Sequence, residues 1–192
     1  MNYLIAAISI FFIYWMNHNT NDRGHSFYTK RINTEKTNPK VYDIFFENAP
    51  FIHNNELELF SNYIYPFLVL FYVSIKTLAF KEIFWNCLIV LLLRALSIRS
   101  TILPSSDKKC EINKNSLIGS CYDKLFSGHF AIVLVTTLVG LKYNVFPIYS
   151  AVLINFINAF IILLCRFHYT NDILMALYAG LTVNKLIIPY VL

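Results

Sequence analysis

The chain has 192 residues, of which 57% are hydrophobic and only 14% are charged, and its mean hydropathy is +0.52. A soluble domain carries about 25% charged residues and no long apolar runs. The composition therefore excludes an ordinary soluble domain and indicates a membrane protein. The net charge of +5 suits anionic lipid surfaces. Because no basic helix or basic stripe is present, we expect no nucleic-acid partner.

Successive apolar runs along the chain predict about six membrane-spanning helices, since lipid-exposed backbone must satisfy its hydrogen bonds internally. We expect the first span to be an uncleaved anchor, because it lacks a basic leader and a small-residue cleavage site. The predicted fold class is all-α, a polytopic helical bundle. We divide it into an N-terminal anchor with a polar loop, residues 1–62, and a transmembrane domain, residues 63–192. The predicted spans are 3–16, 63–80, 83–98, 128–141, 148–164 and 173–191.

This order of spans fixes a relation between two histidines. His129 stands where the fourth span begins, and His168 stands in the connection between the fifth and sixth spans. Two crossings separate them, so both are expected at the same membrane face. The polar loop 17–62 is expected to open on that face as well.

The tripeptide Ser127-Gly128-His129 has the pattern of a helix start. Ser127 could cap the helix, and Gly128 would allow close approach of another backbone. His129 would then lie in the first turn, where backbone N–H groups and the helix dipole favour an anion such as phosphate. The alternative is a helix start with a histidine that merely lies at the membrane interface.

His168 and Asp172 are four residues apart, so on a helical turn they share one face and can touch. A carboxylate on one imidazole nitrogen fixes the tautomer and makes the other nitrogen a better nucleophile. The alternative is a loop histidine with an aspartate that caps the next helix. Two histidines and an aspartate at one membrane face are costly to keep without a role, so together they favour a phosphotransfer site.

Phosphate oxygens need basic groups, and Arg94, Arg99 and Arg166 are the candidates near this face. For each arginine the alternative is ordinary contact with lipid head groups. A metal site is the competing explanation for the histidines and Asp172, but no further ligand with the spacing of a known site lies nearby. We therefore expect no metal and no cofactor.

Several blocks in the chain follow a recognisable order. Residues 121–129 combine a cysteine, an aspartate and an aromatic residue with Ser-Gly-His, and residues 168–172 read His-Tyr-Thr-x-Asp. Upstream blocks contain Arg94, Ser97, Thr101, Leu103 and Pro104, and, as a partial match without a run of prolines, Asp43, Glu47 and Pro50. From about residue 39 onward the chain thus resembles the sphingomyelin synthase family, a branch of the lipid phosphate phosphatase (PAP2-like) superfamily.

The resemblance implies that residues 63–192 form a catalytic domain without a metal. His168 would attack the phosphorus of phosphatidylcholine and expel diacylglycerol, and Asp172 would orient His168. His129 would protonate the leaving oxygen and then deprotonate the primary hydroxyl of ceramide. The expected substrate-binding residues are Arg94, Arg99, Asp123, Ser127, Arg166 and Tyr169.

Departures from the family pattern define the alternatives. The Lys-x6-Arg-Pro block of the phosphatases is absent, and Ile162 stands six residues before His168 where a phosphatase has arginine. This favours the synthase branch over a lipid phosphate phosphatase, which remains the second hypothesis. A non-catalytic lipid-binding membrane protein is the third. The head group stays open between choline, ethanolamine and inositol.

The resemblance implies an integral membrane protein of the Golgi, endoplasmic reticulum or plasma membrane, with a lumenal or exoplasmic catalytic face. A disulfide between Cys110 and Cys121 would fit that side. The Lys and Arg residues point the other way, because most of them flank the catalytic face and the positive-inside rule would place that face in the cytosol.

Overall fold

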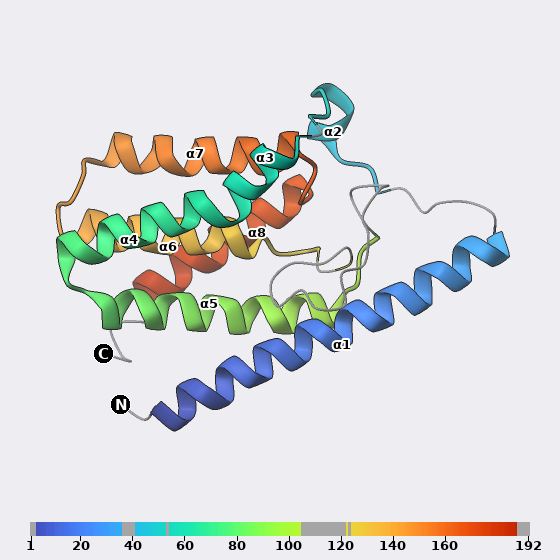
Figure 1. Ribbon diagram of the computed structural model, residues 1–192, viewed down its shortest axis with the longest axis horizontal. Helices are drawn as coiled ribbons and strands as arrows, with labels where there is room; N and C mark the ends of the chain where they lie inside the picture. The colour runs from blue at the N-terminus through green and yellow to red at the C-terminus, as the bar shows by residue number, and fades with distance from the viewer. Residues whose placement is uncertain (1–2, 36–40, 53, 105–121, 123, 188–192) are drawn as a thin grey trace.

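In the computed structural model, the described residues are 3–35, 41–52, 54–104, 122 and 124–187, and all regular structure within them is helical. The predicted all-α class is confirmed. Figure 1 shows the helices in chain order, and two π-helical stretches accompany them. The elements are α1 (Tyr3–Glu35), α2 (Ile44–Asn48), α3 (Asn55–Leu59), η1 (Phe60–Ile64), α4 (Tyr65–Thr77), α5 (Phe80–Ser100), α6 (Gly128–Lys142), α7 (Ile148–Leu164), α8 (Thr170–Thr182) and η2 (Val183–Ile187).

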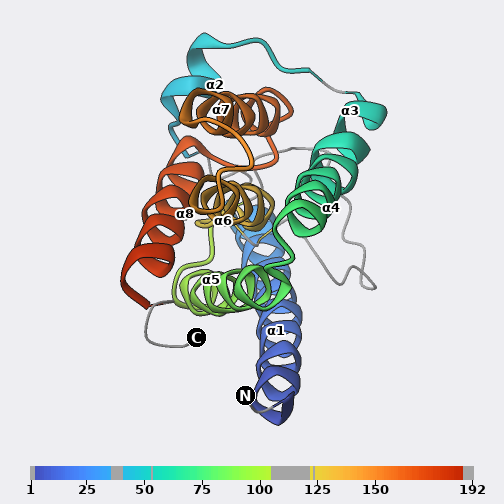
Figure 2. The same ribbon diagram turned by 90° about the vertical axis from the view of Figure 1, so that its left-hand side faces the viewer.

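Helix α6 lies at the centre of the bundle. The end-on view shows α4, α5, α7 and α8 around it, and α6 contacts each of these four helices (Figure 2). Its buried side chains include the near-consecutive Ala131, Val133, Leu134 and Val135, whose spacing places them on different sides of the helix. A helix that is apolar all round is stable only where neighbours cover it. The composition of α6 therefore accounts for its central position.

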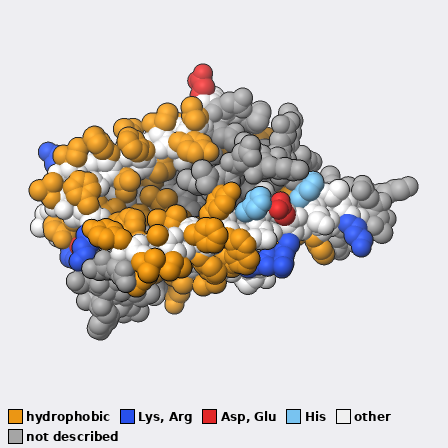
Figure 3. Space-filling model, turned by 60° about the horizontal axis from the view of Figure 1, so that its bottom comes forward, with side chains coloured by type: hydrophobic (Ala, Val, Ile, Leu, Met, Phe, Trp, Pro, Cys, Tyr) orange, Lys and Arg blue, Asp and Glu red, His pale blue; other side chains and the backbone are white. Residues whose placement is uncertain are grey.

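The outer surface of the bundle is strongly apolar. Phe67 and Phe71 on α4 and Val152 and Phe156 on α7 are all more than half exposed. Figure 3 shows a broad band of hydrophobic side chains over the face formed mainly by α1 and α5, with histidine and acidic side chains to its right and Lys and Arg side chains toward both ends. Exposed apolar area of this extent is typical of a surface that faces lipid.

Among the described helices, α5 alone is long and apolar enough to cross a membrane by length and composition. Helices α6 and α7 are apolar but shorter, with 15 and 17 residues. The positions of α6 and α7 agree with the predicted fourth and fifth spans. The predicted sixth span begins at residue 173, whereas α8 already begins at Thr170. The count of about six spans stays a prediction.

The expected polar loop 17–62 is wrong over its first part, because α1 continues as one helix to Glu35. Tertiary contacts hold the second half of α1, and the residues that make them, Gly24 and Tyr28, are one helical turn apart. Gly24 faces Tyr122 and Ile102, and the Tyr28 hydroxyl donates a 2.9 Å hydrogen bond to the carbonyl of Ile102. The Tyr28 ring also stacks on Tyr122 at 5.5 Å. These contacts override the low helix propensity of the polar residues.

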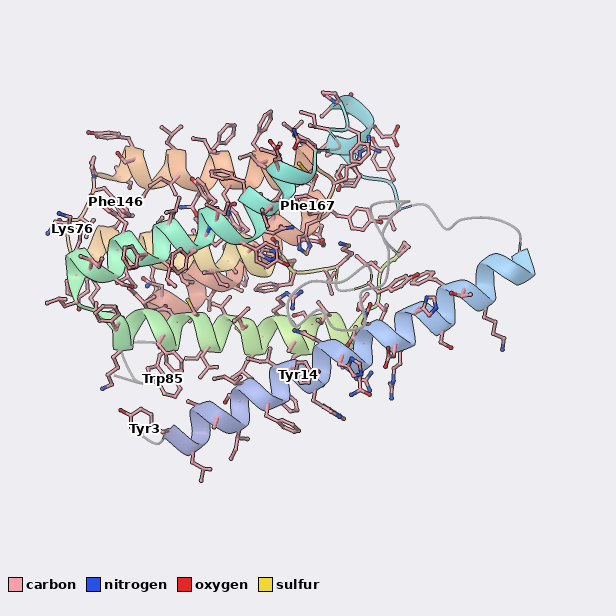
Figure 4. All side chains as sticks on the ribbon, in the orientation of Figure 1. Tyr3, Tyr14, Lys76, Trp85, Phe146 and Phe167 are labelled. Carbon is pink, nitrogen blue, oxygen red and sulfur yellow. The ribbon has the colours of Figure 1, made fainter. Side chains whose placement is uncertain are left out.

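Opposite ends of the bundle differ in character. At the left end in Figure 4, where Lys76 and Phe146 are labelled, Glu82 is buried and accepts hydrogen bonds from the Lys142 ammonium at 2.7 Å and the Tyr143 hydroxyl at 3.1 Å. This pair ties the start of α5 to the end of α6. The other end carries the histidines of interest.

We expect Gly24→Leu to destabilise the protein by about 1–3 kcal/mol, as overpacking of a close contact does. A Cβ at position 24 would lie 2.5 Å from Cβ of Tyr122, an atom that cannot move without its backbone. The measurement is the thermal unfolding midpoint in detergent. The matched control is Ser26→Leu, which adds the same side chain at an exposed position of α1. Equal midpoints for the two variants would contradict the close packing of α1.

Candidate active site

The candidate site lies at the end of the bundle where α7 ends and α6 and α8 begin, at the right of Figure 1. Phe167, labelled in Figure 4, marks the connection between α7 and α8 at this end. The short helix α2 also reaches this connection, because the Phe46 carbonyl accepts a 3.0 Å hydrogen bond from Nη2 of Arg166. Residues from four parts of the chain meet here, namely α2, the turn before α6, the end of α7 and the start of α8.

His168 and Asp172 form a buried pair. Nδ1 of His168 lies 2.9 Å from Oδ2 of Asp172, and the two side chains are 5% and 0% exposed. Oδ2 of Asp172 also accepts a 3.0 Å hydrogen bond from the backbone N–H of Tyr169. The expected contact is present, but not across a helical turn: His168 lies before α8, and Asp172 reaches back to it from the first turn of that helix. In this arrangement the histidine is oriented through Nδ1.

Asp172 also binds the turn that precedes α6. Its Oδ1 accepts a 2.9 Å hydrogen bond from the N–H of Leu125, and its backbone carbonyl accepts one from the N–H of Ser127 at 3.2 Å. Leu125 has a backbone φ of 96°, a region that residues other than glycine rarely adopt. Nζ of the buried Lys124 donates a 2.6 Å hydrogen bond to the carbonyl of Phe167. The turn that leads to His129 is thus fastened to the His168 segment.

The start of α6 has the predicted local structure. Oγ of Ser127 accepts a 3.4 Å hydrogen bond from the N–H of Phe130, as an N-cap does. Gly128 packs closely on Arg94, because a Cβ there would lie 3.0 Å from Nε of that arginine, tighter than an ordinary contact. His129 follows in the first turn and is half-buried, with its ring 6.4 Å from that of Tyr63 in η1. A π-helical stretch beside a candidate site is a common association.

Arg94 is buried and supports the turn. Its Nε donates a 3.2 Å hydrogen bond to the carbonyl of Phe126, and its Nη1 donates one of 3.2 Å to Oδ1 of Asn17. The sequence predicted a substrate-binding arginine here, whereas these contacts engage the guanidinium with the protein itself. Arg94 therefore links α1, α5 and the turn before α6.

The other predicted arginines occupy different surroundings. Arg166, which donates to Phe46, lies over the rings of Phe46 and Phe51, with its guanidinium carbon 5.0 and 5.2 Å from their centroids. Arg99 lies in the last turn of α5, and its Nη1 is buried with no hydrogen-bond partner within the described part of the chain. Of the predicted arginines, Arg99 is thus the one with an unengaged guanidinium nitrogen among the described residues.

Tyr169 is buried, and its hydroxyl donates a 3.2 Å hydrogen bond to the carbonyl of Pro104. Burial raises the pKa of Tyr169 well above its usual value, and the charges of Asp172, Tyr28 and Asp43 raise it further. The hydroxyl therefore stays protonated and serves as a donor. Asp123 lies outside the described residues, as does the proposed pair of Cys110 and Cys121.

Two residues that contact the candidate site, Asp43 and Lys124, were not predicted from the sequence as site residues. Asp43 accepts hydrogen bonds from the N–H and the hydroxyl of Thr170, at 2.6 and 2.8 Å. Lys124 holds the Phe167 carbonyl, as described above. The acidic block around Asp43 was the only signal, and nothing local in the sequence connects it with residue 170. Within the described residues, no group of three or more His, Cys, Asp or Glu side chains could hold a metal ion.

Comparison with known proteins gives one match. Residues 120–187 match a family model described as the PAP2 superfamily C-terminal domain. The matched segment contains His129, His168 and Asp172, and it supports the lipid phosphate phosphatase superfamily, whose members carry out phosphoryl transfer on lipids and are typically membrane-associated. No curated protein and no solved structure matches the chain.

We expect Asp172→Asn to lower the free energy of unfolding by about 1–3 kcal/mol, the cost of leaving a buried hydrogen-bonding group unsatisfied. The new amide NH2 must face either the N–H of Leu125 or the side of Tyr169 N–H and His168, and it cannot accept there. Chemical or thermal unfolding in detergent measures the change. Asp22→Asn, at an exposed site on α1, is the control for loss of the charge alone. Equal stability of both variants would refute the structural role of the carboxylate.

Proposed function

We propose that this protein is a lipid phosphotransferase that moves a phospho-head group, phosphocholine first among the candidates, from a glycerophospholipid to ceramide. The observation that carries the proposal is the buried contact of 2.9 Å between His168 and Asp172. It lies in the segment that matches the PAP2 superfamily, beside the turn that bears His129. Ceramide as acceptor rests on the resemblance of the His168 and His129 blocks to the sphingomyelin synthase family.

In the first half-reaction Nε2 of His168 attacks the phosphorus, and the bond from phosphorus to the glycerol oxygen breaks. The leaving oxygen takes a proton from His129 and departs as the hydroxyl of diacylglycerol. Asp172 holds Nδ1 of His168 and so stabilises the positive charge that develops on the ring. Atoms and charges balance, because the phospho-head group stays on His168 as a phosphohistidine.

In the second half-reaction the primary hydroxyl of ceramide attacks the same phosphorus. His129, now neutral, takes the hydroxyl proton, and the bond from phosphorus to Nε2 of His168 breaks. The enzyme returns to its starting protonation state, as a general acid and base must after a full cycle. No metal or cofactor takes part in this scheme.

Phosphate oxygens carry the developing negative charge, and two features support their binding. The first turn of α6 presents backbone N–H groups, and the helix dipole favours an anion beside them. The buried Nη1 of Arg99 supplies a donor without a partner in the described residues. Ser127, Asp123, Arg94, Arg166 and Tyr169 complete the proposed substrate-binding set.

We also propose that the helices cross the membrane about six times, with the candidate site at one bilayer face. The apolar outer surfaces of α4 and α7 and the membrane-length helix α5 support this arrangement. A lumenal or exoplasmic site in the Golgi, endoplasmic reticulum or plasma membrane follows from the family resemblance, although the flanking Lys and Arg residues favour the opposite side.

The acceptor separates transfer from hydrolysis. Purified protein in mixed micelles with labelled phosphatidylcholine should form a labelled sphingolipid only when ceramide is present. Phosphatidylethanolamine and phosphatidylinositol are tested in parallel as donors, since the head group is the least constrained part of the proposal. Release of the phospho-head group without ceramide would instead favour the hydrolase, in which water resolves the phosphohistidine; labelled phosphatidic acid, from which the same step would release phosphate, tests the lipid phosphate phosphatase alternative.

We expect His168→Ala to lower kcat/KM by at least about 10³-fold, as removal of a covalent nucleophile does. Mass spectrometry of acid-quenched protein, kept cold to protect the labile N–P bond, should show a phospho-head-group adduct at position 168 in the natural chain and none in the variant. His18→Ala is the control, because His18 is exposed on α1 and contacts Asp22. Unchanged lipid turnover in His168→Ala would favour a non-catalytic lipid-binding protein.

A further inference from the structure

Residues 43–52 form a segment that clasps the connection between α7 and α8. The N–H of Ile52 donates a 3.1 Å hydrogen bond to the carbonyl of Leu164 at the end of α7. The ring of Phe46 lies 5.5 Å from that of Tyr169, and its carbonyl accepts from Arg166. The clasp therefore contacts the connection on both sides of His168 in the chain.

Asp43 begins this clasp, and its buried carboxylate accepts four hydrogen bonds. Two come from its own segment, from the N–H groups of Phe45 at 3.0 Å and Phe46 at 3.2 Å. The other two come from Thr170, from its N–H at 2.6 Å and its hydroxyl at 2.8 Å. Asp43 and Thr170 lie 127 residues apart in the chain.

The bonds to Thr170 complete the start of α8. The first N–H groups of a helix lack partners within the helix, and an oxygen of the N-cap side chain usually supplies one. Tyr169, the N-cap of α8, makes no such side-chain bond. Asp172 accepts from the N–H of Tyr169, and Asp43 accepts from the N–H of Thr170. A residue from another part of the chain thus caps the helix.

Asp43 does little for its own helix in comparison. Helix α2 has five residues and none of them is buried, so its cap alone stabilises little structure. The shortest contact of the carboxylate, at 2.6 Å, goes to Thr170 instead. The burial of Asp43 is therefore explained by α8, whose first turn carries Asp172 and is preceded by His168.

We infer that Asp43 is a positioning residue for the nucleophile, which it holds through Thr170. Asp172 fixes the ring of His168, and Asp43 fixes the backbone of Thr170. With both carboxylates in place, Nε2 of His168 keeps one direction toward the phosphorus. The role rests on the proposed function, whereas the contact itself can be tested without any lipid.

The experiment compares full-length variants in the ceramide-dependent assay. Asp43→Asn places an NH2 group at one of the two carboxylate oxygen positions. At the Oδ2 position it would face the N–H of Thr170, and at the Oδ1 position it would face the N–H groups of Phe45 and Phe46. We expect kcat to fall about 10- to 100-fold, with KM changed less than about threefold, because a displaced catalytic group costs rate and not lipid binding. Glu47→Gln is the matched control: it removes an exposed acid from α2, and we expect unchanged kinetics.

A second pair of variants keeps the test decisive if Asp43→Asn folds poorly. Thr170→Val removes only the hydroxyl bond to Asp43, and we expect kcat to fall about 3- to 10-fold. Thr170→Ser keeps the hydroxyl and should restore most of that loss. A rise in KM at constant kcat, or an equal loss in Thr170→Val and Thr170→Ser, would overturn the positioning role.

Hydrogen exchange separates this inference from the proposed function. The amide of Thr170, followed by mass spectrometry of peptides that cover 168–172, should be protected in the natural chain and should lose protection in Asp43→Asn but not in Glu47→Gln. If the natural chain transfers no head group, the proposed function fails, although the exchange result still reports on the clasp. Loss of protection with unchanged kcat would refute positioning by Asp43.

Discussion

The candidate site depends on Asp172, whose carboxylate and backbone carbonyl both accept hydrogen bonds from neighbouring segments. Its two oxygens and its backbone carbonyl bind His168, Tyr169, Leu125 and Ser127, at distances of 2.9 to 3.2 Å. A buried carboxylate is costly unless each lone pair has a donor. Here the donors come from two separate segments, so satisfying the charge also brings the His129 turn to the His168 connection. Solvation of one anion thereby sets the geometry of both histidines.

The apolar character of α6 supplies the other constraint. Because this helix is buried on all sides, its neighbours must surround it, and the ends of α5, α7 and α8 gather around its first turn. The first turn of a helix carries unpaired N–H groups. The bundle thus places a set of donors and a histidine at one end, where Arg99 has a buried nitrogen without a hydrogen-bond partner among the described residues. The opposite end, with Glu82 and Lys142, is closed by its own ion pair.

Local patterns predicted those parts of the fold that depend on neighbours in sequence. The start of α6 at Gly128, the cap by Ser127 and both ends of α7 match the prediction, because apolar runs and cap residues determine them. The contact between His168 and Asp172 was expected across a helical turn, but His168 precedes the N-cap Tyr169, and the contact arises because Asp172, in the first turn of α8, reaches back to the residues before the helix. Catalytic roles, substrate and membrane topology stay predictions.

The features that the sequence did not predict depend on distant contacts. The helical state of residues 17–35 comes from the packing of Gly24 and Tyr28 on Ile102 and Tyr122, which no propensity reflects. The hydrogen bond from Arg94 to the Phe126 carbonyl depends on where the turn before α6 lies, whereas the predicted role of Arg94 in substrate binding stays a prediction. The contact from Asp43 to Thr170 joins segments that no spacing rule relates.

The first helix has a second role besides its length and apolar start. Through Asn17 and Arg94 it is hydrogen-bonded to the carbonyl two residues before Gly128, so α1 also supports the candidate site. A change in the first helix would therefore also alter the surroundings of the turn that leads to His129.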